Sequence, residues 1–191
     1  MESRESILTS IASLSTRERR LIASFRRAGS SVEAGAEKVT ALVDTARALD
    51  AASIPYALIG DVAVGIHSGT PRATLDVNLA ALLSSGRSRV VGALEEAGFR
   101  KTGEFPHSVN FRHPSGEPVQ VAFDPAFDAM ILRAERFEVA GTRVSIVTRD
   151  DLLAMKERAA ADPTRRKSKR LRDQADIELL RGDVPGPDEG W

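Results

Sequence analysis

The segment that decides the fold is "YALIGDVAVGIHSGTPRATLDVNLAAL", which runs from Tyr56 to Leu82. An apolar strand ends at Gly60, a short apolar helix follows, and the segment closes with alternating apolar and polar residues. Alternation with a period of two is typical of a strand, so Asp76 and Asn78 are predicted to share one face. We expect the opposite face to carry Leu75, Val77 and Leu79. The segment therefore predicts two strands joined by a glycine turn and a helix, with polar side chains directed at a charged ligand.

The composition is that of an ordinary globular protein with no excess of either charge. The chain has 191 residues, with 27 basic and 27 acidic side chains, which suits one domain with an appendage. Because the net charge is zero, bulk charge predicts neither a nucleic-acid nor a membrane partner. The absence of cysteine excludes disulfides and thiolate metal sites and fits the reducing cytoplasm, where we expect the protein. No apolar run approaches the roughly 20 residues of a membrane span, and "MESRESILTSIASL" is not a secretory signal.

We expect four parts along the chain. Residues 1–31 form an N-terminal helical arm, 32–147 form the core, 148–182 form C-terminal helices, and 183–191 form a flexible tail. The helices of the arm have apolar faces too short to be stable alone. The arm is therefore predicted to dock on the body, on a protein partner or on a second copy of the chain as a homodimer.

The core and the C-terminal part combine helices with strands. A helix is predicted over about residues 33–51, and two hairpins are predicted at "VNFRHPSGEPVQVAFD" and "RFEVAGTRVSIVT". Thr148 and Asp151 are predicted to cap the helix "RDDLLAMKERAAA", and "RRKSKRLRDQADIELL" is predicted to form the last helix. These elements indicate an α/β (α+β) fold class.

Four motifs in this order resemble the AbiEii-type toxins and the related minimal nucleotidyltransferase-like families. "GDVA" at 60–63 and "RATLDVNL" at 72–79 are similar to the patterns GG-x-A and R-x-T-x-D-I-D-L of those families. "VSIVTRDDLLAMK", which ends at Lys156, and "RDQADIELL", which begins at Arg172, match the later motifs. The resemblance covers about residues 38–181. It implies a nucleotidyltransferase fold, with a mixed, mostly antiparallel sheet flanked by helices, N-terminal helices and a C-terminal helical part.

The resemblance also implies a set of catalytic positions. Two carboxylates on one strand face, with a third from a neighbouring strand, would hold two Mg²⁺ ions that activate an acceptor hydroxyl and bind a triphosphate. The matching residues here are Asp76, Asn78 and Gln120, and the helical motifs add Lys156 and Asp176. Two of the three strand positions are neutral amides, so Asp76 alone keeps its charge. Each lost charge weakens the stabilisation of bound metal and phosphate.

The predicted nucleotide- and phosphate-binding residues surround the glycine turn. Backbone N–H groups of the turn and the following helix face phosphate oxygens, and the resemblance adds Arg72 and Thr74 to Gly60 and Asp61. Asp61 stands where the family has a second glycine or a serine, so its carboxylate would meet phosphates of like charge. An alternative is that Arg72 simply forms an ion pair with Asp76.

Three hypotheses about function stay open on the sequence. In the first, the protein is catalytically weak or inactive and acts by binding a nucleotide, RNA or a protein. In the second, it is an active Mg²⁺-dependent transferase of the toxin–antitoxin or phage-defence type, which moves NMP from NTP to RNA or protein. Asp61 and Asp124 would then assist Asp76 as relocated metal ligands. In the third, the site is packed closed and the protein is a scaffold. Magnesium is expected as a cofactor only under the second hypothesis, that of an active transferase.

The segment Arg165–Arg172 is the most basic part of the chain, with six basic residues in eight. It is a candidate contact for RNA phosphates, and the alternative is a solvated start of the last helix. Asp173 and Asp176 lie three residues apart on that helix and are expected to pair with Lys156 or Arg172.

Overall fold

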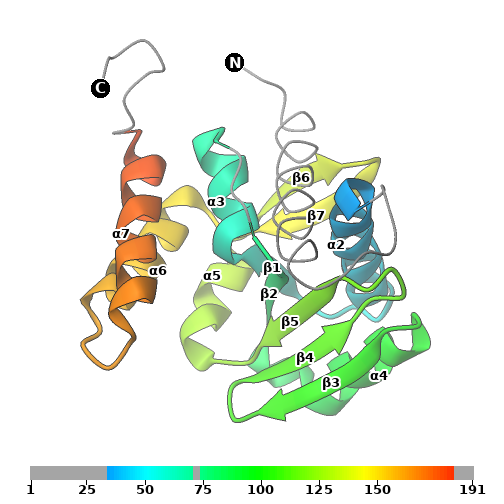
Figure 1. The fold of residues 1–191 in the computed structure, drawn as a ribbon. Coiled ribbons are helices and arrows are strands. Elements are labelled where there is room, and N and C mark those ends of the chain that lie inside the picture. Colours follow the sequence, from blue (N-terminus) through cyan, green and yellow to red (C-terminus); the bar gives the residue numbers. More distant parts are fainter. Residues whose placement is uncertain (1–33, 71–73, 183–191) are drawn as a thin grey trace, which may run out of the picture.

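The computed structural model describes residues 34–70 and 74–182 as a seven-stranded sheet flanked by helices (Figure 1). The sheet has the order β3-β4-β5-β2-β1-β7-β6. The strands are β1 (Tyr56–Ile59), β2 (Val77–Ala81), β3 (Arg100–Phe105), β4 (Ser108–Arg112), β5 (Pro118–Ala122), β6 (Glu135–Val139) and β7 (Thr142–Ile146). The pairs β1–β7 and β2–β5 are parallel, and the other neighbours are antiparallel. The mixed, mostly antiparallel sheet expected from the sequence is thereby confirmed.

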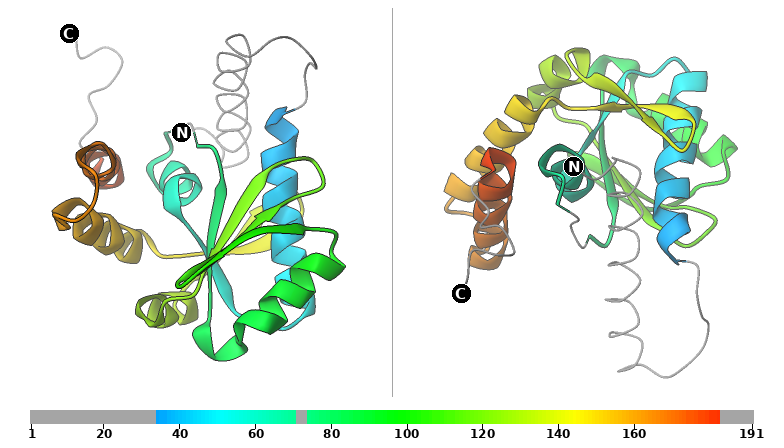
Figure 2. Two further views of the ribbon diagram at one scale, coloured as in Figure 1. Left: turned by 60° about the horizontal axis from the view of Figure 1, so that its bottom comes forward. Right: turned by 90° about the horizontal axis from the view of Figure 1, so that it is seen from above.

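The helices cover both faces of this sheet. They are α2 (Ala34–Ala51), α3 (Gly60–Ser68), α4 (Arg87–Glu96), α5 (Asp128–Leu132), α6 (Arg149–Ala161) and α7 (Lys167–Arg181), with short 3₁₀ turns at Leu83–Ser85 and Pro125–Phe127. Figure 2 shows α2 and α4 on one side of the sheet and α3, α6 and α7 on the other. Helix α7 packs on both α6 and α3, so the two C-terminal helices reach the sheet through α3. Among the described helices, none is long and apolar enough to cross a membrane.

Two adjacent rows of side chains explain how the sheet separates core from cleft. One row crosses four strands with the fully buried side chains Leu58, Leu79, Val121 and Val109. The next row, one residue along each strand, contains Ile59, Asn78, Gln120 and Asn110. Because successive side chains of a strand point to opposite faces, the apolar row faces one side and the amides face the other. The amide side carries the site described below.

Local signals in the sequence account for the best-predicted elements. The β6–β7 hairpin turns at Ala140 and Gly141, whose φ angles of 46° and 73° fit the two-residue turn that favours glycine. Helix α6 begins after Thr148, whose side chain accepts a hydrogen bond of 3.2 Å from the backbone N–H of Asp151. Both hairpins and the cap expected from the sequence are confirmed.

Three elements differ from the prediction. Strand β2 begins at Val77, so Asp76 directly precedes the strand, and Leu75 is 55% exposed instead of buried. Strand β3 was not predicted because its residues, "RKTGEF", do not alternate in polarity, and none of them is buried on this edge of the sheet. Helix α5 has only five residues, too few for a periodic pattern. The predicted N-terminal arm, the tail and Arg72 lie outside the described residues.

Candidate active site

A cleft of about 360 Å³ lies between the polar side of the sheet and the C-terminal helices. Its lining brings together six of the residues that the sequence had singled out as catalytic or phosphate-binding: Gly60, Asp61, Asp76, Asn78, Gln120 and Lys156. Asn78 and Gln120 are direct neighbours across the parallel pair β2–β5. The expected register, with Asp76, Asn78 and Gln120 facing one cleft that Gly60 and Asp61 also line, is confirmed.

Gly60 forms the junction between β1 and α3. Its φ of 74° lies in the left-handed region, and a Cβ atom there would come within 3.1 Å of Cβ of Asn78. Only glycine fits both the backbone angle and the close approach of the neighbouring strand. The turn therefore holds the start of α3, with its free backbone N–H groups, directly beside the strand residues of the cleft.

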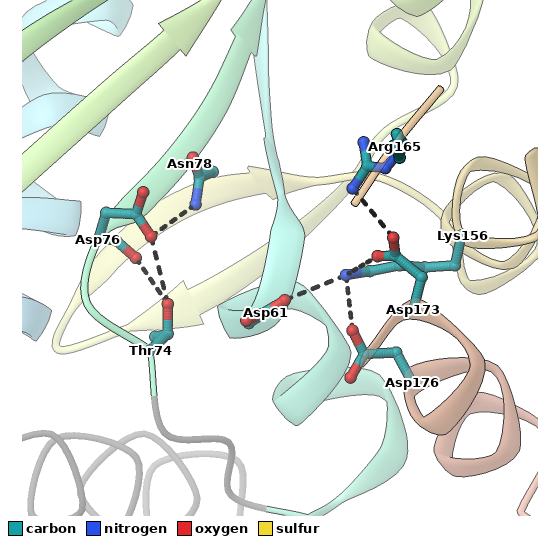
Figure 3. A network of polar contacts seen from close by, with 8 residues as sticks. All are labelled: Asp61, Thr74, Asp76, Asn78, Lys156, Arg165, Asp173 and Asp176. Carbon is teal, nitrogen blue, oxygen red and sulfur yellow. Dashed lines mark hydrogen bonds and ion pairs between the residues drawn. The ribbon is translucent and has the colours of Figure 1, made fainter. Parts of the chain in front are cut away.

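On the strand side, Asp76 is held by two neutral neighbours (Figure 3). Its Oδ1 accepts hydrogen bonds from Nδ2 of Asn78 at 3.0 Å and from Oγ1 of Thr74 at 3.4 Å. The Thr74 hydroxyl also lies 3.2 Å from the backbone oxygen of Asp76, and its side chain is buried. These contacts of Thr74 orient the Asp76 carboxylate. Thr74 itself is not among the residues that line the cleft.

The residues of the strand side do not fit a two-magnesium site. Mg²⁺ prefers carboxylate oxygens, whereas Asn78 and Gln120 offer only neutral amides beside the carboxylate of Asp76. Over the ranges 34–70 and 74–182, no group of three or more His, Cys, Asp or Glu side chains is placed to hold a metal ion. Asp124, the predicted substitute, is not among the residues that line the cleft; its Oδ1 accepts a hydrogen bond of 2.9 Å from the backbone N–H of Ala126.

The helical side of the cleft is built around Lys156 (Figure 3). Its Nζ lies 2.6 Å from Oδ2 of Asp176, 3.0 Å from Oδ1 of Asp61 and 3.3 Å from Oδ1 of Asp173. Asp176 is fully buried, and Lys156 is 9% exposed. The other oxygen of Asp173 accepts a 2.9 Å hydrogen bond from Arg165. The expected pairing of both α7 aspartates with Lys156 is confirmed.

These ion pairs fix both the charge of Lys156 and the position of α7. Burial opposes a charge on the amine, but the carboxylates of Asp61 and Asp176 outweigh burial and raise the pKa of Lys156 above its ordinary value. The ammonium group therefore stays charged at neutral pH. Because its three partners come from α3 and α7, it ties both helices to α6.

The structure gives Asp61 a role that sequence reasoning missed. The sequence suggested that its carboxylate would repel phosphate or hold a metal ion. Instead, Asp61 forms an ion pair with the Lys156 ammonium group, which Asp173 and Asp176 share, so its negative charge is offset in part. The two residues lie 95 positions apart in the sequence, so no local sequence pattern indicates their contact. Only the packing of α6 against α3 brings them together.

The basic segment divides into residues that face the cleft and residues that do not. Arg165, Lys169 and Arg172 line the cleft. Arg170 instead donates from Nε to the backbone oxygen of Ala160 at 3.2 Å. The cleft therefore has a floor formed by Asp76, Asn78 and Gln120, which carries one carboxylate, and a wall formed by α3, α6, α7 and the turn before α7, which carries several cations.

Comparison with known proteins identifies the fold. No family model matches the sequence, and no curated protein matches it. An antigenic nucleotidyltransferase-like protein from Paracoccidioides brasiliensis aligns over 80% of this chain and 80% of its own, with a TM-score of 0.54 and 23% identity. The antibiotic-resistance factor ANT(2'')-Ia aligns over 78% of this chain and 91% of its own, with a TM-score of 0.53 and 18% identity.

A third structure has the same architecture. The lincosamide antibiotic adenylyltransferase LnuA, with lincomycin bound, aligns over 78% of this chain and 97% of its own, with a TM-score of 0.52 and 12% identity. At these identities the likeness establishes the architecture and leaves substrate and activity to be argued from the cleft. The chain therefore has the nucleotidyltransferase fold.

Proposed function

We propose that this protein is a nucleotidyltransferase-like protein of the AbiEii type that binds a phosphate-bearing ligand, an NTP in the first place, and transfers nucleotides weakly or not at all. One observation carries the proposal. The paired strand positions that the resemblance assigns to metal ligands hold the amides Asn78 and Gln120, next to a single carboxylate, Asp76.

The electrostatics of the floor oppose two-metal catalysis. Two Mg²⁺ ions bring four positive charges, which a working site offsets with about three carboxylates and the triphosphate. Asp76 supplies one negative charge, and its Oδ1 already accepts hydrogen bonds from Asn78 and Thr74. An amide oxygen ligates Mg²⁺ but adds no charge. The floor therefore favours neither metal binding nor the charge that develops during phosphoryl transfer.

The wall supplies the binding energy for phosphate. Lys169 and Arg172 present cations to the cleft, Arg165 faces it while paired with Asp173, and Lys156 is shared by Asp61, Asp173 and Asp176. These four cations exceed the three carboxylates by one positive charge. Gly60 adds the N-terminus of α3 as a donor of backbone N–H groups. Phosphates bound in this way need no bridging metal.

RNA is a candidate ligand for the same cations, and a protein partner is a candidate ligand of the N-terminal arm.

Calorimetric titration of NTPs into the full-length protein tests the proposal. Binding is expected to be similar in Mg²⁺ and in EDTA, and Lys169→Ala is expected to weaken it about tenfold, because a charge-assisted contact contributes roughly 1.4 kcal/mol or more. Lys167→Ala is the matched control, because Lys167 is an exposed lysine of α7 outside the cleft lining. Mg²⁺-dependent transfer of label from NTP to RNA or protein, abolished by Asp76→Ala, would instead establish an active transferase.

A further inference from the structure

The polar row of the sheet continues beyond the cleft onto an open face. Gln120 lines the cleft, and across the β4–β5 pair it lies opposite Asn110. Asn110 in turn lies opposite Gly103 on the edge strand β3. None of these three residues is buried, so the face formed by β3, β4 and β5 is accessible next to the cleft.

The two amides on this face form a defined pair of hydrogen-bonding groups. Nε2 of Gln120 donates to Oδ1 of Asn110 at 3.1 Å and approaches Oγ of Ser108 at 3.5 Å. With these contacts made, Oε1 of Gln120 and Nδ2 of Asn110 have no hydrogen-bond partner among the described residues. One pair of neighbouring amides on this face thus offers an acceptor, Oε1 of Gln120, and a donor, Nδ2 of Asn110, a pattern that a carboxylate or a guanidinium group does not provide.

An exposed aromatic ring lies at the edge of the same face. Phe105 is 52% exposed, although large apolar side chains of this size are usually covered. A Cβ atom on Gly103 would come within 3.0 Å of the Phe105 ring and 3.9 Å of Cβ of Asn110. The ring therefore lies over Gly103, on the side of the sheet that carries the amides.

Arg87 holds the backbone at Phe105 and Pro106 in place through hydrogen bonds. Nη1 and Nη2 of Arg87 donate to the backbone oxygens of Phe105 and Pro106, at 2.9 Å and 2.6 Å. The Arg87 guanidinium group also stacks over the ring of Phe123, with its Cζ 5.1 Å from the ring centroid. A fixed backbone loses little conformational entropy when a flat ligand stacks on the ring.

We propose that Phe105, Asn110 and Gln120 form a subsite for a nucleobase that carries an exocyclic amine beside a ring-nitrogen acceptor, as adenine and cytosine do. The base stacks on Phe105, its amine donates to Oε1 of Gln120, and its ring nitrogen accepts from Nδ2 of Asn110. The proposal rests on the proposed function, because the base belongs to the phosphate-bearing ligand whose phosphates contact the wall. Gln120 faces both the cleft and this open face, so it links the two subsites.

Calorimetry with matched ligands tests the subsite in the full-length protein. AMP is expected to bind about tenfold tighter than IMP, which carries an oxygen in place of the amine, because a correct bidentate contact discriminates by at least this factor. Phe105→Ala is expected to weaken AMP binding about tenfold, and Phe105→Trp to retain it. Asn110→Leu, which removes the donor Nδ2 at a position outside the cleft lining, is expected to remove the preference for AMP and to leave tripolyphosphate binding unchanged. Lys167→Ala, an exposed change on α7 outside the cleft lining, serves as the control.

Nucleosides and oligonucleotides make the outcomes separable. Adenosine binding that exceeds inosine binding, with no effect of Lys169→Ala on AMP, would support the subsite and contradict the phosphate wall of the proposed function. Equal binding of AMP and IMP, or an unchanged affinity in Phe105→Ala, would overturn the subsite and leave the wall standing. A short oligoadenylate that binds more tightly than AMP identifies a nucleic-acid strand as the source of the base, and equal affinity identifies a mononucleotide.

Discussion

The floor and the wall of the cleft handle charge in opposite ways. The floor, made by Asp76, Asn78 and Gln120, has one carboxylate, which neutral groups hold by hydrogen bonds. The wall contains a buried lysine that contacts three carboxylates. Buried charges that lose their partners are strongly destabilising, whereas neutral amides are not. The stability of the fold therefore depends on the wall. Substitutions among the polar residues of the floor are expected to change its chemistry with little loss of stability.

The largest expected effect comes from removing the central charge of the wall. Lys156→Met should lower the free energy of unfolding by about 3–5 kcal/mol, because it removes the cation that contacts the fully buried Asp176 and the nearby Asp61 and Asp173. Urea unfolding followed by circular dichroism measures it. Arg181→Ala is the matched control, since Arg181 makes an exposed α6–α7 ion pair with Glu157 at 2.6 Å, and about 1 kcal/mol or less is expected. Equal losses in the two variants would show that the wall is no more critical than an exposed pair.

The next effect concerns the turn where floor and wall meet. Gly60→Ala should lower the free energy of unfolding by about 1–3 kcal/mol, because alanine is strained at a positive φ. The added methyl group would also press on Asn78. Gly116→Ala gives the comparison, because Gly116 has a positive φ but nothing within 4 Å of an added Cβ. The difference between the losses of unfolding free energy in Gly60→Ala and Gly116→Ala measures the crowding against Asn78. Equal losses in the two variants would show that this contact is unimportant.

A smaller effect is expected when charge is returned to the floor. The double variant Asn78→Asp and Gln120→Asp should tighten Mg²⁺-dependent NTP binding about tenfold, which corresponds to roughly 1.4 kcal/mol. Asn78→Asp alone should do less. Adding Asp61→Gly completes the family pattern but takes a partner from Lys156, so the triple variant should also unfold more readily. Calorimetry with and without EDTA measures the binding. If the wild type already binds NTP much more tightly in Mg²⁺ than in EDTA, our account of the floor is wrong.

The smallest effect is the alkaline sensitivity of the wall. The pKa of Lys156 is raised in the folded protein, so its contribution to stability is complete below the unfolded-state value of about 10.5 and is lost as pH rises through the folded-state value. Urea unfolding from pH 8 to pH 11 should therefore show a steeper loss in wild type than in Lys156→Met. Tyr56, whose burial raises its pKa to about 12, is present in both proteins and cancels in the difference. Parallel pH profiles would contradict the charge assigned to Lys156.

The sequence predicted the floor more completely than the wall, for physical reasons. Strand alternation is a local property, so it placed Asn78 correctly, and the matching motif order selected Gln120 as its neighbour. The spacing of Asp173 and Asp176 on one helix face suggested their common partner. The contact between Asp61 and Lys156 depends on how two helices pack, which no periodicity encodes. The aromatic ring of Phe105 was missed for a related reason, because an edge strand exposed along its length shows no apolar alternation.

The parallel pairing of β1 with β7 has a consequence for how the molecule assembles. The central strand β1 can pair with β2 soon after both are synthesised. Its other edge pairs with β7, where Leu58 lies opposite Ile146, and β7 is synthesised much later. Contacts between such distant parts of a chain close slowly. Helices α6 and α7 follow β7 in sequence. During synthesis from the N-terminus, the strands of the floor are complete while the wall has not yet emerged, and until it does, the apolar helix α3 lacks its cover of α6 and α7. The nascent chain is therefore most vulnerable to aggregation in the interval before its last two helices fold.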